Sequence, residues 1–327
     1  MTDDLPGPVL DLMRSGSVAS YATVSAAGVP IDTPVLYFPS EDLATFNLTT
    51  GLAYPVKAER ARRNPRVGLL LEGGPGEPVV AIAGMAAVRD SDLQANVLRY
   101  LAESAHTLPQ NPDWALARQA VWYWTRIIVE VSPARVLWWD NPAAMDQPPH
   151  CWQAPADTIY PASDPAPPGK VSQPASWDQP PWPDLAAQAI SRGAKCHLSL
   201  IDAELFSLPM PVRRAEATRQ GFALDLPRGM PGLREGKACL TFGGVETFIG
   251  ELSGDTLQVE RALPLLPMTQ NAMQLWQPTD DTRAQLMRRL GEELARRGQP
   301  IPVIPQDRPP PSPGYQRRMA RMKAMVG

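Results

Sequence analysis

The chain has 327 residues, a hydrophobic fraction of 44% and a formal net charge of −3. This length fits two domains better than one, and the near-neutral charge gives no reason to expect a nucleic-acid partner. No apolar run approaches the length of a membrane-spanning helix, and the first residues lack the basic and apolar regions of a secretory signal. The three cysteines form no CxxC pair. We therefore expect a cytoplasmic protein with no membrane contact and no disulfide framework.

The first 140 residues predict a mainly β (α+β) fold, in which short antiparallel strands form one closed sheet with peripheral helices. Strands are expected where β-branched residues alternate with others, at residues 18–24, 30–38, 43–49, 66–71, 79–88, 125–131 and 135–139. Helices are expected at residues 8–14, 54–64, 91–104 and 114–122. The helix at 54–64 is strongly basic, and its arginines (Arg60, Arg62 and Arg63) are by default a solvated helix face.

The 38 prolines of the chain are clustered. Residues 142–183 are so rich in proline that neither a helix nor a central strand is expected there. We predict an extended, semi-rigid linker of polyproline character. Its tryptophans, Trp152, Trp177 and Trp182, are expected to hold it against the surface of a neighbouring domain.

The second half of the chain repeats the first. Residues 16–24 are matched by residues 193–201, and Pro34-Val35 by Pro211-Val212. Further matches are Phe46 with Phe222, Gly84 with Gly250, and residues 128–131 with residues 257–260. The sequence thus predicts two tandem split β-barrels. The expected boundaries are 1–141 for the first barrel, 142–183 for the linker, 184–275 for a degenerate second barrel, and 276–327 for an amphipathic helix and a tail that is partly disordered.

The order of motifs in the first barrel resembles the flavin-binding split barrels of the pyridoxamine-phosphate oxidase family and its deazaflavin-using relatives. The residues that carry the resemblance are Ala22-Thr23-Val24, Gly28, residues 34–38, Thr49-Thr50, Lys57, Asn64-Pro65-Arg66-Val67, Gly84, residues 126–131 and Trp138-Trp139-Asp140. The resemblance covers roughly residues 8–140, with a fainter echo across 185–267. The serine that usually precedes the lysine is replaced by Tyr54-Pro55-Val56.

The resemblance implies a flavin mononucleotide (FMN) that lies across the outside of the barrel; a deazaflavin and haem are the alternative ligands. The strand at Pro34, Val35, Leu36 and Tyr37 would meet the flavin ring with its backbone. Thr49, Thr50, Tyr54 and Lys57 would form the phosphate site, where the turn opens onto a helix N-terminus with a favourable dipole. The two barrels would pair within one chain, although a homodimer is the alternative.

These features favour an FMN-dependent oxidoreductase that acts on a small-molecule substrate. No catalytic residue is assigned, because the flavin itself carries the electron chemistry. The alternatives are a flavin- or haem-binding protein without turnover, and a purely structural module. No metal site is expected, since His106, His150 and His197 are scattered and no ligand motif accompanies them.

Overall fold

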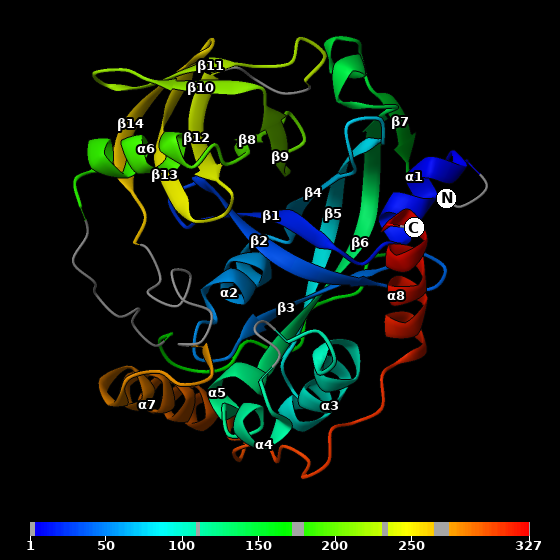
Figure 1. The fold of residues 1–327 in the computed structure, drawn as a ribbon, viewed down its shortest axis with the longest axis vertical. Coiled ribbons are helices and arrows are strands. Elements are labelled where there is room, and N and C mark those ends of the chain that lie inside the picture. Colours follow the sequence, from blue (N-terminus) through cyan, green and yellow to red (C-terminus); the bar gives the residue numbers. More distant parts are fainter. Residues whose placement is uncertain (1–3, 109–111, 172–179, 231–234, 265–274, 327) are drawn as a thin grey trace.

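The computed structural model describes residues 4–108, 112–171, 180–230, 235–264 and 275–326, with side chains described as far as residue 320. Two seven-stranded antiparallel sheets form the body of the molecule, and helices cover their ends (Figure 1). The predicted fold class, mainly β with two tandem split barrels and peripheral helices, is confirmed. No helix in the described ranges has the length and apolarity needed to cross a bilayer.

The first sheet is a closed barrel with one additional edge strand. Its strands are β1 (Val18–Val24), β2 (Pro30–Pro39), β3 (Phe46–Gly51), β4 (Arg66–Glu72), β5 (Val79–Arg89), β6 (Arg126–Trp139) and β7 (His150–Gln153). They are ordered β3-β2-β1-β4-β5-β6-β7, and the pairing of β3 with β6 closes the first six into a barrel. The predicted strands at 125–131 and 135–139 are one continuous strand, β6, which bends at a bulge opposite Ala83 and Gly84.

The second sheet arranges its equivalent strands in the same circular order as the first. Its strands are β8 (Cys196–Ile201), β9 (Ser207–Val212), β10 (Arg214–Ala217), β11 (Gly221–Asp225), β12 (Glu235–Phe242), β13 (Glu246–Ser253) and β14 (Thr256–Ala262). The order β10-β11-β14-β13-β12-β8-β9 places β9 and β10 at opposite edges. Because only Arg213 separates these two strands in the chain, they form one bent stretch that joins the two edges, as β2 does in the first barrel.

Strand register tests the internal repeat residue by residue. Ser20 pairs with Pro34 in the first sheet, and His197 pairs with Pro211 in the second, so the predicted alignment of these strands is confirmed. Gly84 and Gly250 both lie at a bulge, as their alignment requires. The match of residues 128–131 with 257–260 is wrong by three positions. Phe46 pairs with Val131 whereas Phe222 pairs with Leu257, which makes Val131 and Leu257 equivalent.

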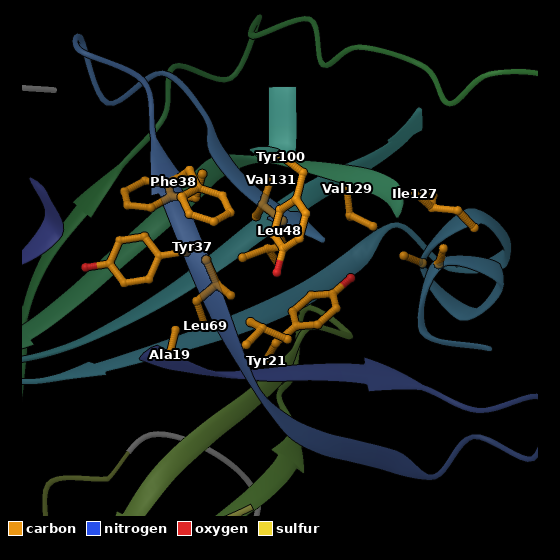
Figure 2. Packing of buried hydrophobic residues seen from close by; sticks show 14 of the residues in the cluster. Ala19, Tyr21, Tyr37, Phe38, Leu48, Leu69, Tyr100, Ile127, Val129 and Val131 are labelled. Atoms are coloured by element: carbon orange, nitrogen blue, oxygen red, sulfur yellow. The ribbon is translucent and has the colours of Figure 1, made fainter. Parts of the chain in front are cut away.

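The first barrel is filled by the inward-pointing side chains of its strands. Figure 2 shows Tyr21, Tyr37, Leu48 and Leu69 converging between the strands, with Val129 and Val131 of β6 above them. Alternation along each strand sends every second side chain inward, which produces this apolar centre. The four tryptophans at 122, 124, 138 and 139 are all buried, and they supply packing area as large aromatic side chains usually do.

Helices close the ends of the barrels. They are α1 (Gly7–Arg14), α2 (Val56–Arg63), α3 (Leu93–Ser104), α4 (Trp114–Ala117), α5 (Val121–Trp124), the 3-10 turn η1 (Pro142–Asp146), α6 (Trp182–Ser191), α7 (Asp280–Arg297) and α8 (Pro313–Val326). The proline-rich stretch thus contributes η1 and the edge strand β7, which pairs with β6. Trp152 and Trp182 pack against the cores of the first and second barrels, whereas Trp177 lies outside the described residues.

The expectation of a partly disordered tail is wrong for α8. Arg318 of this helix is buried, and its Nη1 lies 2.6 Å from Glu103 Oε2 on α3. Its side chain crosses Gly16, where an added Cβ would be 1.7 Å from Arg318 Cδ. A charge-assisted pair and a close fit at a glycine order a segment whose composition alone suggested disorder.

The two barrels pack against each other along β1, β2 and β4 of the first and β8, β9 and β12 of the second. Their backbones approach closely at Gly68, where a Cβ would be 1.9 Å from the carbonyl oxygen of Ser207. A second close contact joins Gly244, in the turn between β12 and β13, to the ring of Pro34. The chain therefore forms an intrachain pair of barrels.

Candidate functional site

The turn from β3 into α2 brings three of the predicted site residues together. The Thr50 hydroxyl donates to the Tyr54 carbonyl oxygen at 3.1 Å, and the Tyr54 amide donates to the Gly51 carbonyl at 2.9 Å. Helix α2 then begins after Pro55, and no side chain caps its first amide groups. Lys57 lies in that first turn. The local sequence thus places a basic side chain and free helix amides at one point, an arrangement suited to an anion.

Thr49 does not share this location. Alternation along β3 turns its side chain to the opposite face, where it lines a cavity of about 390 Å³ between β2, β3, α3 and α8. The structure therefore brings Thr50, Tyr54 and Lys57 together and leaves Thr49 apart from them.

The predicted ring-binding strand divides its side chains between two faces. Val35 and Tyr37 point into the barrel, where the Tyr37 hydroxyl donates to the Leu12 carbonyl at 2.8 Å. Pro34 and Leu36 lie on the outer face, and Leu36 is 40% exposed. Only the backbone and the outer side chains of this strand are therefore available to a ligand outside the barrel.

Lys57 and Arg60, one helical turn apart on α2, are half-buried cations. Neither forms a hydrogen bond or an ion pair in the described part of the chain. Burial, together with the positive charges of Arg126 and Arg60, lowers the pKa of Lys57 to about 8, and Asp32 opposes the shift only in part. Burial also lowers the pKa of Arg60, whose charged neighbours include Arg261 of the second sheet. Unpaired cations held out of water are costly, so this arrangement favours an anionic ligand.

Arg126 is the third cation here, at the first residue of β6. Its guanidinium lies over the rings of Tyr100 and Tyr123, 4.6 and 4.3 Å from their centroids, and its Nε has no hydrogen-bond partner among the described residues. Gly51 lies beside it, because a Cβ at that position would be 3.6 Å from Arg126 Nη1, an ordinary contact distance. We call Lys57, Arg60 and Arg126 the cationic corner.

One carboxylate lies near the cationic corner. Asp32 of β2 is fully buried, and neither of its oxygens has a hydrogen-bond partner within the described residues. Burial raises the pKa of Asp32 to about 6, against the opposing charges of His197 and Lys57. A group that changes charge near neutral pH beside Lys57 can tune the affinity of the corner for an anion.

Some of this site was not predicted. The sequence predicts a solvated face for Arg60, but the structure has it half-buried. Arg62, predicted on the same face, pairs with the buried carboxylate of Asp90 at 2.7 Å. The sequence feature that could have pointed to Asp32 is that it is the one acidic residue in the strand Pro30–Pro39. In the described ranges no group of three His, Cys, Asp or Glu side chains is placed to hold a metal ion.

Comparison with known proteins yields similarity of fold. No protein-family model matches the sequence, and no curated protein matches it either. Solved structures similar to this one include general stress protein 26 from Bacillus anthracis, at 15% identity over 45% of this chain and 96% of that one, with a TM-score of 0.31. A pyridoxamine 5'-phosphate oxidase-related, FMN-binding protein from Nostoc punctiforme has 15% identity over 40% of this chain and 80% of that one, with a TM-score of 0.30. An F420 reductase has 15% identity over 42% of this chain and its full length, with a TM-score of 0.32.

Proposed function

We propose that the chain binds FMN at the cationic corner and acts as a flavin-dependent oxidoreductase on a small-molecule substrate. The observation that carries this proposal is that the side chains of Lys57 and Arg60, at the junction of β3 and α2, form no hydrogen bond or ion pair with a described residue. This junction is where the resemblance to the flavin-binding family implies the phosphate. A phosphate group satisfies buried cations better than water does, because charge-assisted hydrogen bonds are stronger in a partly dry site.

The side chains present fit such a group. Lys57 and Arg60 would supply the charge, and the uncapped amide groups at the start of α2 would supply backbone donors. Thr50 fixes the turn through its bond to Tyr54 and so holds the helix end in place. The strand from Pro34 to Tyr37 would offer its backbone to the flavin ring, on the face that also meets the second barrel.

FMN supplies hydride and electron transfer when it is bound. The contribution of the protein is then to bind the phosphate, orient the ring and exclude water. The second barrel borders the corner, because Arg261 and Cys239 lie near Arg60. In this arrangement one chain provides both barrels that enclose the cofactor.

Cofactor binding and turnover are tested separately on the full chain. The purified protein is denatured to release any chromophore, which is identified by mass, and the apoprotein is then titrated with FMN, with a deazaflavin and with haem. Anaerobic addition of a reduced nicotinamide should bleach the visible flavin absorbance of an oxidoreductase.

Each outcome has a separate meaning. FMN binding followed by bleaching supports the proposal. FMN binding that no nicotinamide or other donor reduces would indicate the binding protein without turnover. A colourless protein that binds no flavin would refute the proposal and leave only the paired barrels.

A further inference from the structure

Arg289 of α7 is a buried cation. Only 1% of the residue is exposed, and Nε, Nη1 and Nη2 all lack an acceptor within the described ranges. Removing a guanidinium from water without compensation costs several kcal/mol, so such residues usually pair with an acid or bind an anion. Burial lowers the pKa of this arginine, against the opposing effects of Tyr54, Glu293 and Glu292.

The other buried arginines on the same face of α7 are fully paired. Arg296 contacts Glu59 of α2 and Glu293, and Arg297 lies 2.9 Å from Asp90. Arg289 precedes Arg296 by seven residues, or two helical turns, and therefore faces the same way. These ion pairs, with the buried leucines of α7, already attach the helix to the barrel. Docking of α7 does not require the charge of Arg289.

Arg289 lies at the same junction as the cationic corner. Its guanidinium is 4.4 Å from the centroid of the Tyr54 ring, and Tyr54 ends the turn that Thr50 holds by its hydrogen bond. Lys57 follows three residues later, in the uncapped first turn of α2. The arrangement places a planar fork of donors over Tyr54, the residue just before Pro55 and the start of α2.

The acids of α7 nearest to Arg289 are already paired with other arginines. Of the acids nearest to it on α7, Glu292 binds Arg288 at 2.6 Å, and Glu293 binds Arg296 and Arg297. The preceding residues 265–274, which lie outside the described ranges, contain no Asp or Glu in their sequence. Within the described residues the guanidinium of Arg289 thus has no acceptor, which leaves it available to an anionic ligand.

We propose that Arg289 binds the phosphate group of the flavin and makes the site selective for FMN over riboflavin. This inference rests on the proposed function, and it adds a residue from a helix beyond both barrels. A guanidinium can donate two parallel hydrogen bonds to phosphate oxygens, which gives selectivity as well as affinity.

The test compares Arg289→Met with Arg288→Met in the full chain. Arg288 immediately precedes Arg289 on α7, but its side chain is 59% exposed and forms a surface pair with Glu292. It therefore controls for the loss of one arginine. Affinities for FMN and for riboflavin are measured by titration of the apoprotein. Thermal unfolding of the apoprotein is measured with inorganic phosphate and with chloride at the same ionic strength.

Arg289→Met should weaken FMN binding about 10- to 100-fold, the loss expected for a charge-assisted hydrogen bond. Riboflavin affinity should stay unchanged, and apoprotein stability should not fall, because an unpaired buried charge is removed. Phosphate should stabilise the parent and Arg288→Met but not Arg289→Met. Arg289→Lys, which keeps the charge but not the fork, should be intermediate.

Equal FMN affinity in Arg289→Met and the parent would overturn the inference, and so would a parallel loss of FMN binding, riboflavin binding and apoprotein stability. A parent that phosphate does not stabilise would also overturn it. Phosphate stabilisation that depends on Arg289, in a protein that binds no flavin, would refute the proposed function and keep Arg289 as an anion-binding residue.

Discussion

His197 Nε2 of the second barrel lies 2.7 Å from Glu72 Oε2 of the first. The other ring nitrogen of His197, Nδ1, lies 2.7 Å from the Ser20 hydroxyl, so one imidazole joins two strands of the neighbouring barrel. Burial lowers the pKa of His197, but the bond to Glu72 and the charges of Asp32 and Glu72 outweigh it, and the net pKa is raised. The hydrogen bond and charge of His197 likewise lower the pKa of Glu72 against the effect of its burial. The contact between the barrels is therefore sensitive to pH.

We predict that His197→Gln destabilises the protein most in mildly acidic solution. A raised folded-state pKa means that the stabilisation by charged His197 is complete below its unfolded value and is lost as pH rises through the raised value. The stabilisation by Glu72 is present above its unfolded pKa and is lost as pH falls through the lowered value. The difference in unfolding free energy between parent and variant should therefore be about 1–2 kcal/mol near pH 5.5 and shrink by about pH 8.5. Urea unfolding at a series of pH values measures it; a difference independent of pH would refute an ionic role for His197.

Asp32→Asn should stabilise the protein, and increasingly so as pH rises. The pKa of Asp32 is about 6 in the folded protein against 3.8 as its ordinary value, so the folded state resists its ionisation and the parent loses stability as pH rises through this window. The shift corresponds to about 3 kcal/mol once the carboxylate is fully charged. The gap between Asp32→Asn and the parent should thus widen between about pH 4 and pH 6 and level off above about pH 7. Repeating the comparison in a His197→Gln background removes the coupled titration of the imidazole; a constant gap would show that Asp32 ionises normally.

Gly244→Ala should weaken the contact between the barrels. Gly244 has φ +72°, and a Cβ there would be 2.2 Å from Pro34 Cγ. Gly254, in the turn between β13 and β14, has a similar φ of +59° and open space around it. Gly254→Ala therefore incurs only the backbone strain of about 1 kcal/mol, whereas Gly244→Ala adds a clash, for a total of about 2–3 kcal/mol. Equal losses in the two variants, measured by thermal unfolding, would mean that Pro34 moves aside freely.

The fold was predictable where local pattern and packing agree. The strand Val18–Val24 was predicted to the residue, because alternating β-branched side chains meet a half-buried sheet. The strand expected at 43–49 instead spans Phe46–Gly51. The Asp42 side chain accepts hydrogen bonds from Ser40 and the Ala44 amide, and Leu43 adopts a φ of +58°, so a polar turn replaces the apolar start of the strand. A pattern of apolar residues does not reveal such local hydrogen bonds.

The candidate site was predictable only in part. Thr50, Tyr54 and Lys57 are close in the chain, so a turn into a helix was enough to bring them together. Arg289 lies more than 200 residues beyond them in a helix rich in charge, where nothing in its sequence separates it from the paired Arg296. What distinguishes an anion-binding arginine is the absence of a partner after the helix has packed. That property belongs to the tertiary structure.

Lys57 provides a pH-dependent test of the proposed site. Its pKa is about 8 without a ligand because burial and two neighbouring arginines disfavour its charge, and a bound phosphate would raise that pKa. Binding above pH 8 must then take up a proton, so FMN affinity should fall by up to about tenfold per pH unit there. Lys57→Met should bind FMN about 10-fold or more weakly at pH 7 and lose this part of the pH dependence. Lys170→Met, at an exposed lysine in the proline-rich stretch, should behave as the parent. Riboflavin affinity should show no such dependence on Lys57. If FMN affinity falls equally above pH 8 in the parent and in Lys57→Met, the ionisation that controls binding belongs to another group.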